Sequence, residues 1–174
     1  MARGHRPNSA VCRCGETTIE LAGEPILSVI CYCESCRTAG RAFERDLGAP
    51  QTDNADGGVA YCLYRKDRVK IAQGADHLRE YRLKPDSPTR RVVASCCSSP
   101  MFLDFTPAHW LTVFRDRLAA PTPEPQFCTM AKDKPEGLER SNAIPAYDTQ
   151  PPRFFIKLLA AWAAMGLRRP KVAW

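Results

Sequence analysis

Three closely spaced cysteines form the pattern in this sequence that is best suited to chemistry. Cys31, Cys33 and Cys36 follow the spacing C-x-C-x-x-C, directly after the apolar run from Ile26 to Ile30. A strand that ends at the first cysteine and a tight turn through the other two would bring three thiolates onto one cation. Zinc favours such ligands, and a zinc ion with three protein ligands keeps a position for water or substrate. The spacing therefore predicts a zinc site, either open for catalysis or completed by a fourth ligand elsewhere in the chain.

Two further cysteine pairs predict a second site. Cys12 and Cys14 form a C-x-C pair followed by a glycine, and Cys96 and Cys97 are adjacent. Because a C-x-C pair supplies only two ligands, it needs partners from a distant segment, and the Cys96–Cys97 pair is available. We expect a structural zinc ion on these four residues, with Cys97 as the better-placed ligand of the late pair. Both thiols of a Cys-Cys dipeptide reaching one ion would be strained.

The elements that must position these cysteines are mostly short strands separated by turns rich in glycine, proline and aspartate. A short helix is expected at 38–46, and the segment 128–148 gives no clear pattern. A C-terminal helix is expected at about 152–167, where Pro151 and Pro152 suit a helix start. The helix is expected to pack on its own domain, with a homodimer contact or a membrane-surface contact as alternatives. The expected strands are 17–21, 26–30, 59–64, 68–72, 78–83, 90–95, 101–105 and 110–114.

Composition limits the class of protein. The 174 residues fit one domain, 1–174, and the net charge of +6 with a pI of about 8.9 comes from scattered arginines without a dense basic run. Nucleic acid binding is therefore not expected. There is no apolar signal segment and no apolar run of about 18 residues, so neither secretion nor a transmembrane segment is expected. Nine cysteines, an odd number, indicate metal sites in a reducing cytoplasm rather than paired disulfides.

The order of the cysteine motifs resembles that of a known family. C-x-C-G near the start, then C-x-C-x-x-C, then a cysteine turn before Ser99-Pro100, is similar to the glutathione-dependent formaldehyde-activating enzymes, which include the centromere protein V-type domains. The resemblance covers about residues 10–115, which would form the domain core ahead of a C-terminal extension. It implies a mostly β fold, a β-tent of small antiparallel sheets with zinc knuckles. It also implies a structural zinc at Cys12 and Cys14.

The late motif departs from the family pattern F-C-x-x-C-G-x-P-L. When Ser99-Pro100 is aligned, Cys97 takes the place of the second cysteine, but Ala94 takes that of the first and Ser98 that of the glycine. Cys96 is then an addition. The sequence therefore resembles a divergent branch with a Cys-Cys turn, and the identity of the fourth ligand of the structural site is not fixed by the motif.

The resemblance implies a carbon–sulfur lyase-like activity on thiol–aldehyde adducts, with zinc (one or two per chain) and glutathione as a co-substrate. In this hypothesis Cys31, Cys33 and Cys36 hold the catalytic zinc. Three thiolates weaken the Lewis acidity of the ion, so a nearby cation would help, and Arg37 is the first candidate. The partners would be a small-molecule thiol or aldehyde. The alternative is a zinc-stabilised binding or interaction module without catalytic activity, in which a fourth protein ligand closes the site or no ion is held.

Overall fold

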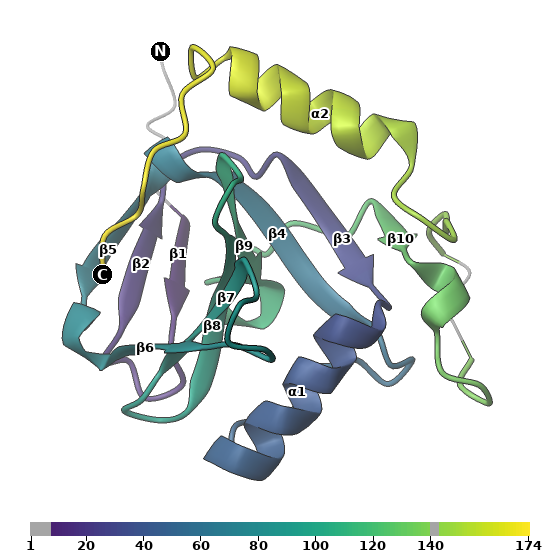
Figure 1. The fold of residues 1–174 in the computed structure, drawn as a ribbon, viewed down its shortest axis with the longest axis horizontal. Helices are drawn as coiled ribbons and strands as arrows, with labels where there is room; N and C mark the ends of the chain where they lie inside the picture. Colours follow the sequence, from purple (N-terminus) through teal and green to yellow (C-terminus); the bar gives the residue numbers. More distant parts are fainter. Residues whose placement is uncertain (1–7, 140–142) are drawn as a thin grey trace.

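Ten short strands, two α-helices and four single 3-10 turns make up the described part of the chain, residues 8–139 and 143–174 of a computed structural model (Figure 1). The three-stranded sheet has the order β1-β2-β5, and the seven-stranded sheet has the order β10-β3-β4-β9-β8-β7-β6. The predicted mostly β fold class with a C-terminal helix is confirmed. The strands are β1 (Asn8–Val11), β2 (Thr18–Leu21), β3 (Leu27–Cys31), β4 (Val59–Arg65), β5 (Val69–Gln73), β6 (Leu78–Tyr81), β7 (Thr89–Ala94), β8 (Ser99–Phe105), β9 (Trp110–Phe114) and β10 (Phe127–Thr129).

Strand β4 separates two hydrophobic cores. Its side chains alternate between them, because successive residues of a strand point to opposite faces of the sheet. Cys62 and Tyr64 pack into a core that includes the three-stranded sheet, whereas Tyr61 packs into a core that includes the first helix. Cys12 belongs to the first core and Cys36 to the second. The two cysteine groups therefore lie on opposite faces of the same central strand.

Helix α1 (Glu34–Leu47) begins four residues before the predicted start at Thr38. Cys33 is its N-cap residue, and the Cys33 sulfur accepts a hydrogen bond from the Cys36 backbone N–H at 3.4 Å. The helix ends at Gly48, which adopts the left-handed conformation with φ 62°. The turn predicted through the later cysteines is thus the first turn of a helix. Cysteine is not among the usual N-cap residues, so the sequence pattern did not mark this start.

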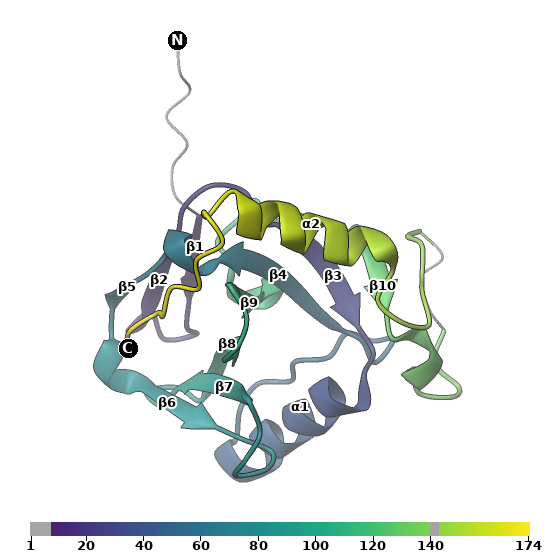
Figure 2. The same ribbon diagram turned by 45° about the horizontal axis from the view of Figure 1, so that its top comes forward.

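Helix α2 (Pro152–Ala163) lies across the ends of β3 and β4 (Figure 2). Pro152 occupies the first turn, as predicted, but the helix ends four residues before 167. Gly166 and Leu167 both have positive φ, 66° and 58°, and the Leu167 N–H donates to the Trp162 carbonyl. This left-handed turn ends the helix and directs the last residues back along the domain.

The region after β9 adds a strand, β10, to the seven-stranded sheet. β10 pairs in parallel with β3 and places Thr129 opposite Cys31. The last residue, Trp174, packs edge-on against Phe102 at 5.2 Å and lies under the Arg90 guanidinium at 4.4 Å. β10 therefore contributes to the surroundings of the cysteine triplet, whereas Trp174 packs on the first core, which contains Cys12. The division into a core at about 10–115 and a C-terminal extension stays a prediction.

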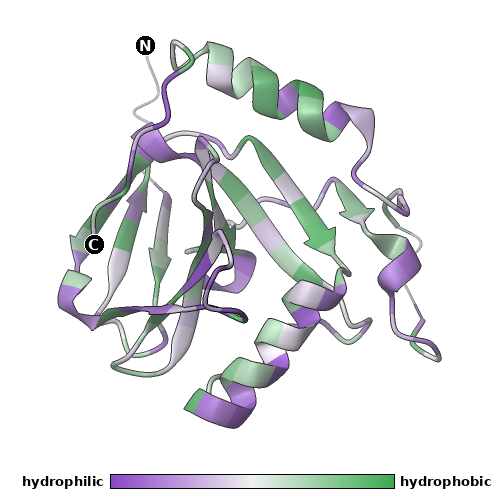
Figure 3. Cartoon of the chain, in the orientation of Figure 1, coloured by the Kyte–Doolittle hydropathy of each residue, from purple (hydrophilic) through white to green (hydrophobic). Residues whose placement is uncertain are grey.

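Helix α2 combines apolar and basic residues along its length (Figure 3). Phe155, Ile156 and Leu159 are largely exposed on it. Neither helix in the described residues has the length and apolar character needed to cross a bilayer. A homodimer contact through this helix stays a prediction.

His109 connects α2 to the sheet. Its Nε2 donates a hydrogen bond to the Leu158 carbonyl oxygen at 2.8 Å, and its ring stacks on Trp162 with centroids 5.7 Å apart. Burial lowers the pKa of His109, and although the Leu158 carbonyl opposes this shift, nearby cations add to it. The cations that face the imidazole are Arg65, Lys66 and Arg169. Burial and these cations therefore favour the neutral imidazole in the fold.

Stability is expected to decrease as the pH falls below the ordinary histidine value. Because the pKa of His109 in the fold lies below its unfolded value of about 6.5, the unfolded chain binds more protons as the pH falls. We expect the free energy of unfolding to fall between about pH 7.5 and about pH 5.5, and His109→Gln to remove part of this fall. Urea unfolding at both pH values measures the effect, with His77→Gln as the matched control. Equal pH dependence in wild type and His109→Gln would contradict the assignment.

Candidate metal centres

The cysteine triplet lies where β3 ends and α1 begins. Cys31 is the last residue of β3, Cys33 caps α1, and Cys36 lies in the first turn of that helix. The three Sγ atoms all lie within 4.8 Å of one another. Within residues 8–139 and 143–174, no fourth histidine, cysteine, aspartate or glutamate joins this group. The structure thus gathers the three predicted residues and leaves one side of the group without a protein ligand.

The pKa values of the three thiols are spread widely. Hydrogen bonds with Cys31 and Cys36 lower the pKa of Cys33 to about 3, although burial opposes this shift. The pKa of Cys31 is raised to about 11, chiefly by its hydrogen bond with Cys33, and that of Cys36 is raised by its bonds with both neighbours. The helix N-terminus also favours a thiolate at Cys33. A divalent metal that binds here must therefore displace the protons of the other two thiols.

A buried arginine, which the sequence analysis did not single out, lies beside the triplet. Arg91 is 3% exposed, its Nη2 donates to the Ser35 hydroxyl at 2.7 Å, and its charge helps to lower the pKa of Cys33. Arg37, the predicted candidate, instead donates to two backbone carbonyl oxygens, at 3.1 and 2.7 Å. The sequence does not distinguish Arg91 from the other scattered arginines, because only the packing of β7 against α1 buries it.

A cavity of about 170 Å³ opens beside the triplet, and Cys31, Cys36 and Tyr61 line it together. Tyr61 is buried, and both it and Cys36 belong to the second core. Burial, together with the charge of Cys36, raises the pKa of Tyr61 well above its usual value, so the phenol stays protonated at neutral pH. A small molecule in this cavity would meet thiols and a hydroxyl donor. The other lining residues are Val29, Leu63, Leu103, Trp110, Thr112, Thr129, Gln150 and Phe154.

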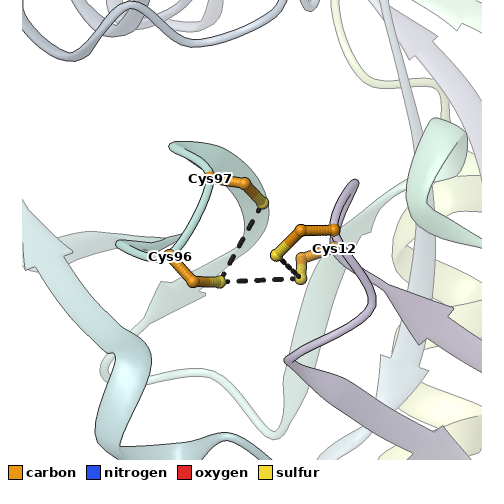
Figure 4. A group of neighbouring side chains, drawn as sticks. Cys12, Cys96 and Cys97 are labelled. Carbon is orange, nitrogen blue, oxygen red and sulfur yellow. Dashed lines mark hydrogen bonds between the residues drawn. The ribbon is translucent and has the colours of Figure 1, made fainter.

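The four remaining clustered cysteines meet between the β1–β2 loop and the β7–β8 turn (Figure 4). The Cys12 sulfur lies 3.6 Å from that of Cys14 and 3.7 Å from that of Cys96, and the Cys96 and Cys97 sulfurs are 4.0 Å apart. Gly15 has φ 85°, which lets the loop turn sharply directly after Cys14. The group therefore joins the N-terminal strand to a hairpin far along the chain.

Both sulfurs of the Cys-Cys dipeptide reach this group. Ala94, at the family position of the first late cysteine, is fully buried in the core. Cys96 places its sulfur beside Cys12 instead. Ser98, at the family position of the glycine, adopts φ 56°, so the turn keeps the left-handed backbone that glycine adopts more easily. The added cysteine thus supplies the fourth sulfur that the sequence left open.

Local hydrogen bonds favour thiolates at two of these four cysteines. Burial opposes a thiolate at Cys97, but hydrogen bonds from the Ser99 hydroxyl and the Cys14 backbone outweigh it and lower the pKa of Cys97 to about 6. The pKa of Cys12 is also lowered, because a hydrogen bond from the Thr17 N–H at 3.2 Å and those with Cys14 and Cys96 together outweigh its burial. Cys12 and Cys97, two of the cysteines that the resemblance carries over, therefore lose their protons more readily than an ordinary thiol, whereas the pKa of Cys14 is raised.

The sulfur spacings fit a zinc ion. Zinc–sulfur bonds of about 2.3 Å in a tetrahedral arrangement place neighbouring sulfurs about 3.8 Å apart. The spacings of 3.6, 3.7 and 4.0 Å in the four-cysteine group agree with this value. The donor set consists of thiols alone, which zinc accepts and which magnesium or calcium does not favour.

Comparisons with known proteins agree with the cysteine pattern. The family model described as glutathione-dependent formaldehyde-activating enzyme matches residues 7–116, a range that holds both cysteine groups. A crystal structure of a Rhodobacter sphaeroides protein is similar at 15% sequence identity and a TM-score of 0.44, over 80% of this chain and 99% of that one. The comparison with curated proteins found no match. The matched range ends before β10 and α2, so these two elements lie outside it.

Proposed function

Since the chain belongs to the glutathione-dependent formaldehyde-activating enzyme family, we propose that it is a zinc-dependent carbon–sulfur lyase-like enzyme acting on thiol–aldehyde adducts. The triplet geometry carries this proposal. Three cysteine sulfurs converge beside a cavity, and no fourth protein ligand joins them among the described residues. A structural zinc ion usually has four protein ligands, whereas a catalytic one keeps a position for water or substrate.

Each cysteine group has its own role in this proposal. Cys31, Cys33 and Cys36 would hold the catalytic zinc ion, and the group around Cys12 and Cys96 would hold a structural one. Zinc at the triplet would lower the pKa of a substrate thiol or polarise a carbonyl oxygen. The four-cysteine ion would connect β1 to the β7–β8 turn and so contribute to folding.

The reaction needs no oxidant or reductant. In the direction of adduct formation, a bond forms between the substrate sulfur and the carbonyl carbon of the aldehyde. The S–H bond breaks, and the proton ends on the former carbonyl oxygen. Cleavage of the adduct reverses these steps and returns the proton to sulfur.

The protein side chains around the cavity support this chemistry. Tyr61 stays protonated and lines the cavity with Cys36, so its hydroxyl is placed to donate a hydrogen bond to an oxygen of the substrate. Arg91 contributes positive charge close to Cys33, which offsets part of the negative charge of three thiolates. Apolar side chains such as Leu63 and Leu103 in the cavity wall would lower the local dielectric and so strengthen both electrostatic effects.

Metal content and turnover test the proposal together. We expect about two zinc ions per chain by mass spectrometry of protein purified without added zinc, and about one in Cys33→Ser. The variant should keep the wild-type circular dichroism spectrum and lose turnover of a hemithioacetal. Cys62→Ser, at an isolated buried cysteine, should keep both ions and the activity.

Three results would contradict the proposal. Absence of zinc from the wild-type protein would exclude both sites. A Cys33→Ser variant that retains two ions would exclude this cysteine as a ligand. Collapse of the fold in Cys33→Ser, with Cys62→Ser intact, would make the ion structural and favour the alternative of a binding module.

A further inference from the structure

Two cavities meet beside the cysteine triplet. The inner cavity of about 170 Å³ contains Cys31 and Cys36 in its wall, and an outer cavity of about 520 Å³ lies along α2. Trp110, Gln150 and Phe154 line both of them. These three side chains therefore lie where the two cavities adjoin, and we call the two adjoining cavities, from α2 to the thiols, the groove.

The walls of this groove are apolar. Leucine, phenylalanine and tryptophan side chains dominate the outer part, among them Phe155 and Trp162, whereas the inner part combines apolar side chains such as Leu63 with uncharged polar ones such as Thr112. Of the described residues that line the two cavities, Arg169 alone carries a full charge, and it belongs to the outer part. No aspartate or glutamate is among them. The groove thus offers apolar contact along its length and a cation at its far end.

This lining does not suit glutathione. Glutathione carries carboxylates and an ammonium group, and burial of such charges is costly unless each is paired. Among the described residues that line the groove, none has a carboxylate to pair with the ammonium. Arg91 lies close to the triplet, but it is buried against Ser35 and lines neither cavity. A charged peptide would therefore lose hydration here and gain only the Arg169 guanidinium as a charged partner among these residues.

We propose that the groove binds the carbon skeleton of an apolar thiol or aldehyde, aromatic or aliphatic, with its reactive end at Cys31 and Cys36. This inference rests on the proposed function, because it places the reacting atom at the triplet. The inner cavity accommodates a group of the size of one aromatic ring, and a longer chain extends under α2. The C-terminal region outside the family match supplies Gln150 and Phe154, so part of the lining lies outside the matched range.

Three thiols that differ in their substituents test the preference. Benzyl mercaptan carries an apolar ring, glutathione a charged peptide, and 2-mercaptoethanol almost nothing beyond the thiol. All three thiols would form the same thiolate–metal bond, so differences between their affinities measure the contribution of the groove. Titration of the zinc-containing protein by calorimetry should give benzyl mercaptan an affinity at least about tenfold above both others, because its ring leaves water. Glutathione binding as tightly as benzyl mercaptan would overturn the inference.

An isosteric variant tests whether the apolar substituent of the thiol binds at the junction of the two cavities. Gln150 is exposed and lines both cavities, so Gln150→Glu adds a charge at the junction with little risk to folding. We expect it to lower the ratio of benzyl mercaptan to 2-mercaptoethanol affinity by about fivefold or more, since the ring then lies beside a carboxylate. Gln73→Glu, an equally isosteric change at an exposed position in β5, is the matched control and should leave the ratio unchanged. An unchanged ratio in Gln150→Glu would overturn the assignment of the groove.

The outcomes separate this inference from the function on which it rests. Selective binding of benzyl mercaptan without turnover of any adduct would support the groove and contradict the lyase. Turnover of a glutathione adduct with no preference for benzyl mercaptan would support the lyase and overturn the groove.

Discussion

The variant Cys12→Ser is expected to lose one zinc ion per chain and at least about 3 kcal/mol of the free energy of unfolding. Cys12 is the cysteine whose sulfur lies between those of Cys14, at 3.6 Å, and Cys96, at 3.7 Å. Removing it breaks the connection between β1 and the β7–β8 turn. The loss should stay below the roughly 10–16 kcal/mol that zinc supplies to small zinc-finger peptides, because two hydrophobic cores remain. Zinc analysis and urea unfolding measure the two effects.

Cys62→Ser provides the matched control for this change. Cys62 is also buried in the first core, but it belongs to neither cysteine group, and its sulfur lies 3.4 Å from the Ser28 hydroxyl. The same substitution there should cost about 1 kcal/mol and leave the zinc content unchanged. Similar losses of stability in both variants, with an unchanged zinc content in Cys12→Ser, would show that Cys12 is not a ligand of a structural metal.

A second large effect is expected from Asp104→Asn, which should lower the free energy of unfolding by about 3–5 kcal/mol. The Asp104 carboxylate forms a buried ion pair with Lys66, with Nζ and Oδ1 2.7 Å apart, and a second ion pair with Arg90. Lys66 also donates to the Ala108 carbonyl oxygen at 2.8 Å. The neutral asparagine would leave the buried Lys66 ammonium without its counter-charge. Urea unfolding at constant pH measures the loss.

Two variants show whether the cost comes from the unpaired buried charge. Asp46→Asn removes the same charge from a surface ion pair with Arg45, where solvent screens the interaction, and should change stability far less. The double variant Lys66→Met/Asp104→Leu removes both buried charges and should recover much of the stability lost in Asp104→Asn. Equal losses in Asp104→Asn and the double variant would place the cost in packing rather than in the charge. Because Ala108 lines the outer cavity, this ion pair also supports the wall of the proposed groove.

Local sequence patterns were sufficient to predict most of the strands. β4 was recognisable as a continuous apolar run, since both faces of this strand are buried, and β5 as an alternating one. β10 was not recognisable, because its three residues form a strand only through pairing with β3. The start of α1 was missed as well, since its cap is a cysteine.

By itself the sequence determined which cysteines form the two candidate metal groups. The spacings of Cys31, Cys33 and Cys36 and of Cys12 and Cys14 identify two groups, because a turn of a few residues brings neighbouring thiols together whatever the rest of the chain does. The same motifs determined the family, which the match to residues 7–116 confirms.

Only the tertiary structure decided what surrounds those thiols. It brought the Cys96 sulfur to that of Cys12 across 84 positions, buried Arg91 beside the triplet and placed Phe154 of α2 in the cavity wall. Each of these contacts joins segments far apart in the chain, and its energy comes from the burial of side chains that no local pattern pairs. The identity of the ligands is therefore local information, whereas the shape and charge of the site depend on packing.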